Sequence, residues 1–373
     1  MGTKITNSRI AKWRIESDEE KRLATLADKY EEEKINYVNY YRENDPVYYE
    51  KGMKMIEKVL DEFRGGIDDT ERQKYIVDMI YSLHRFGCMY NEYFLFGFEN
   101  LNTRGRGQFI TDKNRYFFYD ALNSDENFML FKSKERTYAK FKDFYKRDVI
   151  LVSSSDDFDT FCSFREKHQE FIVKPQTGHQ GRGVFIEHKS YDNDRKVFER
   201  IIKDGPVVIE ELVKQAEEMA KLHPESVNTV RIPTVKTPKG EIILFHPRLR
   251  VGIGSSIVDN AGSGGIIAPV DPETGIVTQQ GITEHGKYYL RHPDTGVVFP
   301  GFQVPKWNEA VRFVNDLANV LGSGAGYVGW DCALTEKGWI MLEGNLYGQF
   351  GDQYATKIGD KNELEEILGL HFE

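Results

Sequence analysis

Apolar residues recur at helical spacing over the first part of the chain. From about Ser17 to Gly87, leucine, tyrosine and methionine are mixed with glutamate and lysine, and Asp45-Pro46 and Gly65-Gly66 interrupt the pattern. Interruptions of this kind end helices, so we expect three amphipathic helices here. The charge runs in this part are most simply solvated helix faces. The pattern predicts a helical N-terminal region over residues 1–87.

The pattern changes after residue 87. Residues 88–150 are rich in aromatic side chains, the stretch Phe128–Arg147 has helical spacing, and Val149–Val152 starts a strand. We expect this stretch to be a mixed α/β region.

Short β-rich runs separated by glycine-containing turns fill most of the remaining chain, and one further helix is expected at 307–321. We therefore expect an α+β fold whose strand-rich region covers 151–373. The expected strands lie at residues 171–173, 184–186, 207–209, 227–235 and 241–251.

An acidic hairpin near the C-terminus offers three hard oxygen ligands. Two apolar runs, Tyr327–Leu334 and Trp339–Leu342, are joined by a turn. Antiparallel pairing would bring Asp331 beside Glu343 and Asn345, whose i, i+2 spacing places both side chains on one face. Such a cluster suits Mg²⁺, which binds through one or two carboxylates and keeps positions for water and phosphate. A hairpin rim with ordinary surface acids is the alternative.

A glycine-rich loop follows a lysine at the end of the first of these strands. Lys174 closes the apolar run, and Gly178, Gly181 and Gly183 come directly after it. Such a loop lets backbone N–H groups approach phosphate oxygens, and the lysine supplies a point charge. The order differs from a P-loop and from a dinucleotide fingerprint, both of which need a helix after the glycines. A flexible hairpin without a ligand is the alternative.

Acidic residues interrupt the strand Val207–Val213 at Glu210 and Glu211. The main chain of such a segment can hold an adenine edge in an apolar pocket, while a carboxylate accepts from ribose hydroxyls. A strand that emerges into solvent is the alternative.

Three arginines lie on neighbouring expected strands. Arg231 is on one, and Arg248 and Arg250 share a face of the next. Paired guanidinium groups match phosphate or carboxylate oxygens, and Asn260 in a following glycine-rich turn can add an amide donor. Each arginine alone would be read as a surface ion pair, but the three together indicate an anion site.

Length, charge and cysteine content exclude several classes of protein. At 373 residues the chain is expected to form two or three domains, and its net charge of −9 argues against nonspecific binding to nucleic acid. Three scattered cysteines are too few for a disulfide framework or a zinc site. No apolar run approaches the roughly 18 residues that span a bilayer, so a cytoplasmic location is expected.

The order of these elements resembles that of the ATP-grasp superfamily. The resemblance covers roughly residues 130 to 350, and it is most specific at Phe171–Val184 and Gly329–Asn345. The stretch 259–265 is more similar to the sugar-transfer-associated ATP-grasp proteins of polysaccharide gene clusters than to the ribosomal-protein glutamate ligases. The resemblance implies an ATP-grasp fold with a helical N-terminal extension, and it implies that ATP and Mg²⁺ are used.

Roles follow from the resemblance position by position. Lys174 matches the lysine that contacts the nucleotide phosphates, and Lys134 is chosen for the earlier lysine, with Lys132 as a close competitor. The other implied assignments are a mobile phosphate lid at Gly178, Gly181 and Gly183, an adenine hinge at Glu210, Glu211, Leu212 and Val213, magnesium ligands at Asp331, Glu343 and Asn345, and stabilisation of the transferred group by Arg231, Arg250 and Asn260.

The activity implied is that of a ligase. A substrate carboxylate would attack the γ-phosphate of ATP, and an amine would then displace phosphate from the acyl phosphate. The carboxylate and amine are expected on small molecules or on glycan-linked groups. An ATP-dependent small-molecule kinase and a noncatalytic nucleotide-binding assembly protein are the alternatives, and the sequence predicts no oligomeric state.

Overall fold

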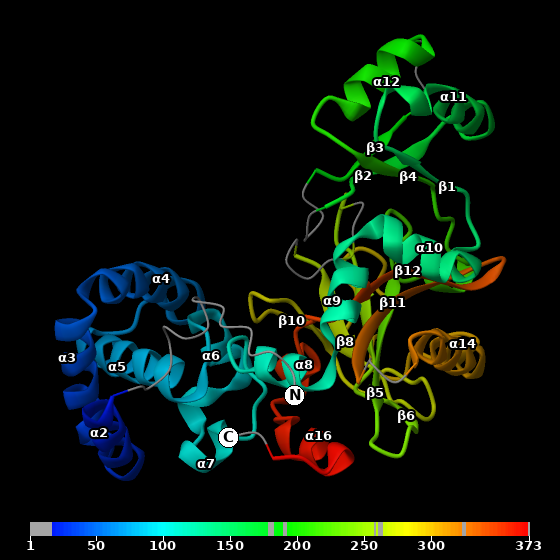
Figure 1. Cartoon of the computed structure of the whole chain (residues 1–373). Coiled ribbons are helices and arrows are strands. Elements are labelled where there is room, and N and C mark those ends of the chain that lie inside the picture. Colours follow the sequence, from blue (N-terminus) through cyan, green and yellow to red (C-terminus); the bar gives the residue numbers. More distant parts are fainter. Residues whose placement is uncertain are drawn as a thin grey trace.

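The computed structural model describes residues 17–177, 183–188, 192–256, 259, 264–322 and 326–371. Within these residues there are two antiparallel sheets, and a group of N-terminal helices lies beside the larger one while the smaller sheet lies above it (Figure 1). The predicted α+β class is confirmed. No helix among the described residues has both the length and the apolar character that a bilayer-spanning segment needs.

The described residues 17–87 contain four α-helices, so the prediction of three between Ser17 and Gly87 is wrong. The missed break lies at Tyr30, whose extended backbone ends the first helix before the short 3-10 turn η1 (Glu31–Glu33). Neither glycine nor proline marks this break, which is why the apolar pattern does not show it. The helices are α2 (Asp18–Lys29), α3 (Lys34–Asn44), α4 (Pro46–Arg64) and α5 (Asp69–Phe86).

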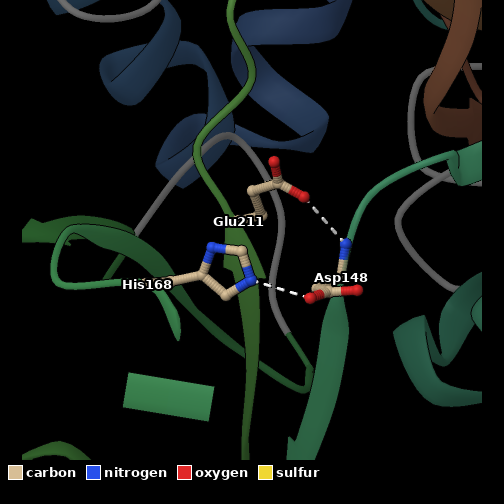
Figure 2. A group of neighbouring side chains, drawn as sticks. All are labelled: Asp148, His168 and Glu211. Atoms are coloured by element: carbon tan, nitrogen blue, oxygen red, sulfur yellow. Dashed lines mark hydrogen bonds and ion pairs between the residues drawn. The ribbon is translucent and has the colours of Figure 1, made fainter. Parts of the chain in front are cut away.

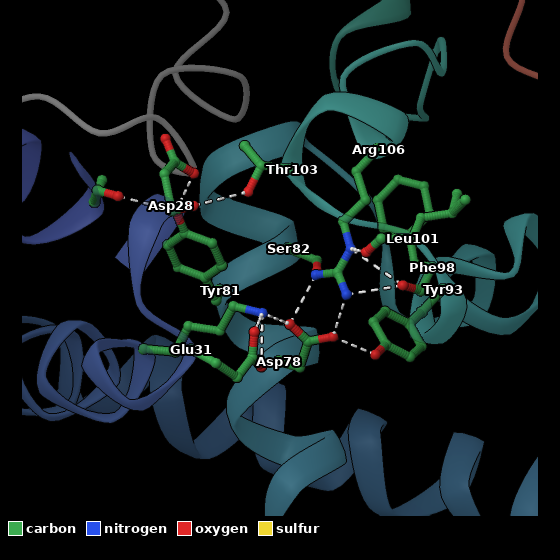
Figure 3. Close-up of polar contacts among 12 residues, drawn as sticks. Asp28, Glu31, Asp78, Tyr81, Ser82, Tyr93, Phe98, Leu101, Thr103 and Arg106 are labelled. Atoms are coloured by element: carbon green, nitrogen blue, oxygen red, sulfur yellow. Dashed lines mark hydrogen bonds and ion pairs between the residues drawn. The ribbon is translucent and has the colours of Figure 1, made fainter. Parts of the chain in front are cut away.

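A buried ion-pair network joins α3 and α5 to two helical segments further along the chain (Figure 3). The carboxylate of Asp78 accepts hydrogen bonds from Arg106 at 2.7 Å to each oxygen, from Lys34, and from the Tyr93 hydroxyl. Burial favours the neutral acid, but the charges of Arg106 and Lys34 outweigh it and hold the pKa of Asp78 below its ordinary value. Four separate helical segments are thereby joined around a single anion.

Helices continue up to the first strand, so residues 88–150 are less mixed than expected. The expected helix 128–147 is divided at Ser133, whose hydroxyl accepts from the Arg136 N–H and begins a second helix. The helical segments are α6 (Tyr90–Phe96), η2 (Phe98–Asn100), α7 (Thr103–Arg106), α8 (Arg115–Leu122), α9 (Asp125–Lys132) and α10 (Lys134–Tyr145).

The smaller sheet has the strand order β1-β4-β2-β3 with antiparallel neighbours. Alternate residues of its strands pack against Phe161 and Phe164 of one helix and Phe198 of another, which cover the same face (Figure 1). Its elements are β1 (Val149–Val152), η3 (Ser155–Asp157), α11 (Phe158–Lys167), β2 (Phe171–Pro175), β3 (Phe185–Glu187), α12 (Asp194–Ile202) and β4 (Val207–Glu211).

The larger sheet has the order β10-β9-β8-β7-β5-β11-β12, with β6 beside β5. The expected strand 241–251 is split in two at His246, which has a positive φ of 47°, and Pro247, which has no N–H to donate. The strands are β5 (Thr229–Lys236), β6 (Ile242–Leu244), β7 (Arg248–Val251), β8 (Ile266–Pro269), β9 (Gly281–Ile282), β10 (Tyr288–Tyr289), β11 (Tyr327–Thr335) and β12 (Gly338–Asn345).

Helices complete this half of the molecule. The amphipathic helix α14 (Trp307–Val320), predicted at 307–321, packs its apolar face on the larger sheet around Trp330 and Trp339. The remaining helices are α13 (Glu217–Ala220), α15 (Asp352–Thr356) and α16 (Lys361–Leu368).

The hydrophobic cores cross the expected region boundaries. The core of the N-terminal helices runs from Leu23 to Phe109 and also includes Ile282 of β9 and Tyr354 and Ala355 of α15. The division into 1–87, 88–150 and 151–373 therefore stays a prediction.

Candidate active site

The acidic hairpin predicted near the C-terminus is present. β11 and β12 pair in antiparallel fashion, with Asp331 opposite Glu343 and Gly329 opposite Asn345. A bulge after Asp331 changes the register of the pair. The strands bring all three predicted metal ligands to the same end of the hairpin, and their role as ligands stays a prediction.

Two arginines hold the Asp331 carboxylate. Arg231 of the neighbouring strand β5 donates to both of its oxygens, Arg250 Nη1 lies 3.0 Å from Oδ2, and the Asn345 amide donates to Oδ2 at 3.2 Å. Burial would raise the pKa of Asp331, but the two guanidinium groups lower it to about 2. In this arrangement Asp331 is a counter-ion with both oxygens engaged.

A second carboxylate balances the arginines. Asp259 Oδ1 lies 3.4 Å from Arg250 Nη2, and its Oδ2 accepts the N–H of Thr229 at 3.1 Å. Two cations thus face two anions. Asp259 belongs to the stretch 259–265 that carries the family resemblance, but the sequence predicted a role only for its neighbour Asn260, which lies outside the described residues.

Arg248, the third arginine of the expected anion site, points elsewhere. Its guanidinium donates to the carbonyl of Gln349 and lies 3.5 Å from Asp352, away from the Asp331 cluster. The expected group of three is therefore a pair, Arg231 and Arg250.

Gly344 allows α9 to pack closely against the acidic hairpin. A Cβ at this position would stand 2.2 Å from Cε1 of Phe131, a ring at the end of α9. Only glycine leaves room for that ring between Glu343 and Asn345, and Phe131 packs on Trp330 beneath. The junction of α9 and α10 is thereby seated on β12, next to the exposed carboxylate of Glu343.

Lys134 begins α10 at this junction and faces the charged groups. Burial lowers the pKa of its ammonium group, the nearby carboxylates of Glu343 and Glu210 act in the opposite direction, and Lys174 adds to the lowering. Lys132, its competitor, is exposed at the end of α9. The structure brings Lys134 toward Lys174 and Glu343.

Lys174 is paired with Glu210 at the junction of the two sheets. Its ammonium lies 2.7 Å from Glu210 Oε1, and Arg147 donates to Oε2 through Nε at 2.9 Å and Nη2 at 2.6 Å. Burial opposes ionisation, but Lys174 and Arg147 lower the pKa of Glu210 to about 2. Arg147 also donates to the carbonyl of Met341 on β12 at 2.7 Å, so it links the smaller sheet to the larger one.

This pairing gives Glu210 contacts that the sequence did not predict. Both of its carboxylate oxygens accept from cations, Oε1 from Lys174 and Oε2 from Arg147, and the expected contact with ribose hydroxyls stays a prediction. Arg147, which supplies one of those cations, precedes β1 without any motif that would draw attention to it.

A family model described as sugar-transfer associated ATP-grasp matches residues 113–368 of the 373. The chain belongs to this family. The predicted resemblance to sugar-transfer-associated ATP-grasp proteins is confirmed. The predicted ATP-grasp fold with a helical N-terminal extension is also confirmed. A comparison with curated proteins found no match.

Solved structures give more distant likenesses. D-alanyl-alanine synthetase A from Vibrio cholerae is 11% identical with a TM-score of 0.41, over 62% of this chain and 60% of that one. Carboxyaminoimidazole ribonucleotide synthase from Aspergillus clavatus, complexed with ATP, is 13% identical with a TM-score of 0.42, over 68% and 55%. ATP-grasp ligase PsnB with precursor, Mg and ADP is 15% identical with a TM-score of 0.37, over 72% and 65%.

These likenesses are too distant to transfer an activity. The chain spans 48% to 60% of the length of the first three structures that it matches.

In this ATP-grasp chain the predicted hinge, residues 210–213, spans the end of β4 and the start of the following loop. Glu211 ends the strand, and Leu212 and Val213 lie half-buried in the loop beyond it. Glu211 Oε2 accepts the N–H of Asp148, whose carboxylate lies 2.7 Å from His168 Nε2 (Figure 2). These contacts hold the beginning of the hinge against β1, and the hinge role stays a prediction.

Of the predicted lid, only its last glycine can be placed. Gly178 and Gly181 lie outside the described residues. Gly183 has a φ of 73°, and a Cβ there would stand 2.9 Å from Pro175 Cγ. Both the backbone conformation and the contact with β2 require glycine at this position.

The two lysine candidates can be separated by substitution. Lys134→Ala is expected to raise the KM for ATP about tenfold or more, because it removes a half-buried charge that faces Lys174 and Glu343. Lys132→Ala removes an equal charge from an exposed position of the adjacent helix and is the matched control. Steady-state kinetics in ATP measures both, and an equal effect of the two substitutions would contradict the assignment.

Proposed function

We propose that this chain is an ATP- and Mg²⁺-dependent ligase that joins a carboxylate to an amine through an acyl phosphate. We further propose that the substrates belong to glycan or polysaccharide modification, as the description of the family suggests. The observation that carries the proposal is the arrangement of charge around one hairpin. Lys134 faces Glu343 on one strand, and Arg231 and Arg250 meet at Asp331 on the other.

The residues present fit ATP and Mg²⁺. Glu343 and Asn345 offer hard oxygen donors on one face of β12, and the Glu343 carboxylate is exposed. Asp331 completes the set only when an arginine releases one of its oxygens. Lys134 and Lys174 supply charge for the phosphates, and the main chain of Leu212 and Val213 is left for the adenine edge.

The ion pairs at Asp331 suggest how the site handles an arriving anion. Arg231 and Arg250 are held ready by Asp331, and both can turn to the oxygens of a transferred phosphoryl group without first being desolvated. The carboxylate that they release becomes a ligand. The site thus exchanges one set of ion pairs for another, which keeps buried charges paired throughout.

Chemistry then rests on positioning and charge neutralisation. A substrate carboxylate oxygen attacks the γ-phosphorus while the bond to ADP breaks, and an amine nitrogen next attacks the acyl carbon, so that phosphate leaves and the nitrogen loses a proton. Mg²⁺, when bound, neutralises phosphate charge. Arg231 and Arg250 face the acyl phosphate, and no covalent nucleophile of the protein is required.

Hydroxylamine trapping tests the proposal. The protein is incubated with ATP, Mg²⁺, hydroxylamine and a panel of sugar acids, amino acids and other small carboxylates. The expected products are a hydroxamate, ADP and free phosphate, with no hydroxamate when ATP is omitted.

Other outcomes would identify the alternatives. A stable phosphorylated alcohol with no hydroxamate from any acid would indicate a kinase. ATP binding without turnover on any acid, amine or sugar tested would indicate a noncatalytic assembly protein. A cytoplasmic location, where ATP is abundant, is part of the proposal.

A further inference from the structure

A second cluster of ligand-type side chains lies on the larger sheet, at the end of the chain. His246 stands in the loop between β6 and β7, Asp352 begins α15, and Asp360 directly precedes α16. One ring nitrogen of His246 and one oxygen of each aspartate lie within 4.8 Å of one another. None of the three residues belongs to the site proposed for ATP.

The two aspartates are buried and incompletely paired. Asp352 is 1% exposed and Asp360 is 3% exposed. Among the described residues, the buried Oδ2 atom of each has no hydrogen-bond partner. An unsatisfied buried carboxylate oxygen costs several kcal/mol as a rule, so two of them in one cluster indicate that a component is missing.

Position and charge both point to a cation. Asp352 Oδ2 lies 3.8 Å from His246 Nδ1, and Asp360 Oδ1 lies 3.7 Å from Nε2. A third carboxylate, Glu363, approaches Nε2 at 3.0 Å from the solvent side. The one guanidinium nearby, Arg248, is 3.5 Å from Asp352 Oδ1 and already donates to the carbonyl of Gln349. Three acidic groups thus outnumber one arginine.

We propose that His246, Asp352 and Asp360 form a site for a divalent transition-metal ion. A mixed set of one imidazole and several carboxylates suits Zn²⁺ or Mn²⁺ better than Mg²⁺, which prefers oxygen alone. Ligand atoms at about 2.0–2.2 Å from a tetrahedral Zn²⁺ lie roughly 3.4 Å apart. Asp360 Oδ1 at 3.7 Å from Nε2 and Asp352 Oδ2 at 3.8 Å from Nδ1 are near that value. One ion binds only one ring nitrogen, so on metal binding the carboxylate beside the other nitrogen moves toward the ion, and one ligand atom of each residue already lies within 4.8 Å of the others.

The ion would act as a clamp. It would join the loop that leads into β7 to α15 and α16, in addition to the contact that Arg248 of β7 already makes with Asp352 of α15. β7 carries Arg250 two residues further on, so the clamp would fix the position of that strand. This inference does not depend on the activity proposed for the chain, because the ligands contact none of the residues assigned to ATP.

A shared proton is the competing explanation for the same cluster. Burial raises the pKa of Asp360 well above its ordinary value, and the neighbouring Asp352 raises it further. Protonation of one aspartate would supply a donor to the other and satisfy one oxygen without a metal. The two explanations predict opposite effects of Asp360→Asn, which supplies a permanent donor but removes an anionic ligand.

Metal binding to the full-length protein tests the proposal. Protein treated with EDTA and then dialysed against Zn²⁺ is expected to retain about one Zn²⁺ per chain by elemental analysis, and Zn²⁺ is expected to raise its thermal midpoint. Mn²⁺ and Mg²⁺ are compared separately, and Mg²⁺ is expected to have no effect on this site. Co²⁺ in place of Zn²⁺ gives a visible absorption spectrum that reports the imidazole and carboxylate ligands.

Variants assign the bound ion to these residues. Asp360→Asn and His246→Gln are each expected to weaken Zn²⁺ binding by more than about tenfold. Glu366→Gln removes the same charge from an exposed position of the same helix and should bind Zn²⁺ as the wild type does. The wild-type measurements stand even if a variant fails to fold.

Two results would overturn the proposal. The first is a wild-type protein that retains no Zn²⁺ or Mn²⁺ while Asp360→Asn is more stable than wild type, which would establish the shared proton. The second is Zn²⁺ binding that is unchanged in both Asp360→Asn and His246→Gln, which would place the ion elsewhere.

Discussion

Glu343→Gln is expected to lower turnover about 100-fold or more while the protein remains as stable as the wild type. The substitution keeps the shape of the side chain but removes its charge, and a neutral amide is a poor ligand for a hard cation. Glu343 is exposed, and no hydrogen bond from its carboxylate holds the fold together among the described residues. The substitution should therefore lower activity without changing stability.

The measurement is ATP turnover under saturating substrate, with a thermal melt of the same preparation. Glu336→Gln is the matched control, because it removes an equal charge from the exposed turn of the same hairpin. Raising the Mg²⁺ concentration should recover part of the activity of Glu343→Gln if metal affinity is what was lost. Full activity in this variant would contradict the metal assignment.

Asp331→Asn is expected to lower both turnover and the free energy of unfolding, the latter by about 3–5 kcal/mol. The reason is that Arg231 and Arg250 keep their charges inside the protein while their common counter-ion becomes neutral. Urea unfolding measures the loss. Asp316→Asn on the exposed face of α14 is the control and should change stability by less than about 0.5 kcal/mol. If Asp331→Asn lowered the free energy of unfolding by as little as the control does, the ion pairs of Asp331 would contribute little to stability.

The wild-type protein offers the same test through pH. The pKa of Asp331 is lowered from its ordinary 3.8 to about 2 in the folded chain. A lowered pKa means that the unfolded chain binds the proton more readily, so the contribution of this group is present above about pH 4 and is lost as pH falls toward 2. It amounts to roughly 2–3 kcal/mol. Glu210 and Asp78 add losses of the same sign, so Asp331→Asn should still lose stability in acid, but by a smaller amount than the wild type.

The hairpin and most strands follow from local pattern. Two apolar runs joined by a turn predict an antiparallel hairpin. The register that places Asp331 opposite Glu343 follows once the two strands pair. The same holds for α14, whose apolar stripe is continuous. Breaks without glycine or proline, at Tyr30 and Ser133, are not visible in such patterns, because tertiary contacts and capping decide them.

The partners of buried charges were harder to predict. A sequence indicates that Arg231 and Asp331 belong to the same region, but not that one neutralises the other. Glu210 is a second example. Its place in a strand suggested a contact with a ligand, and the sequence did not predict that its carboxylate pairs with Arg147 and Lys174. Arg147 lacks any motif, and Asp259 lies in the recognised stretch 259–265 without a predicted role. Only the contacts between distant strands give either residue a role.

The shared core of the N-terminal helices has a practical consequence for anyone who shortens this protein. The family match begins at residue 113, which invites expression of the ATP-grasp part alone. Ile282, Tyr354 and Ala355 would then lose the helices that cover them, and the cut would leave an exposed apolar surface on the remaining piece. The part that matches the family model, residues 113–368, is thus smaller than the part that shares one hydrophobic core. In this chain the N-terminal helices belong to the same folded structure as the ATP-grasp part.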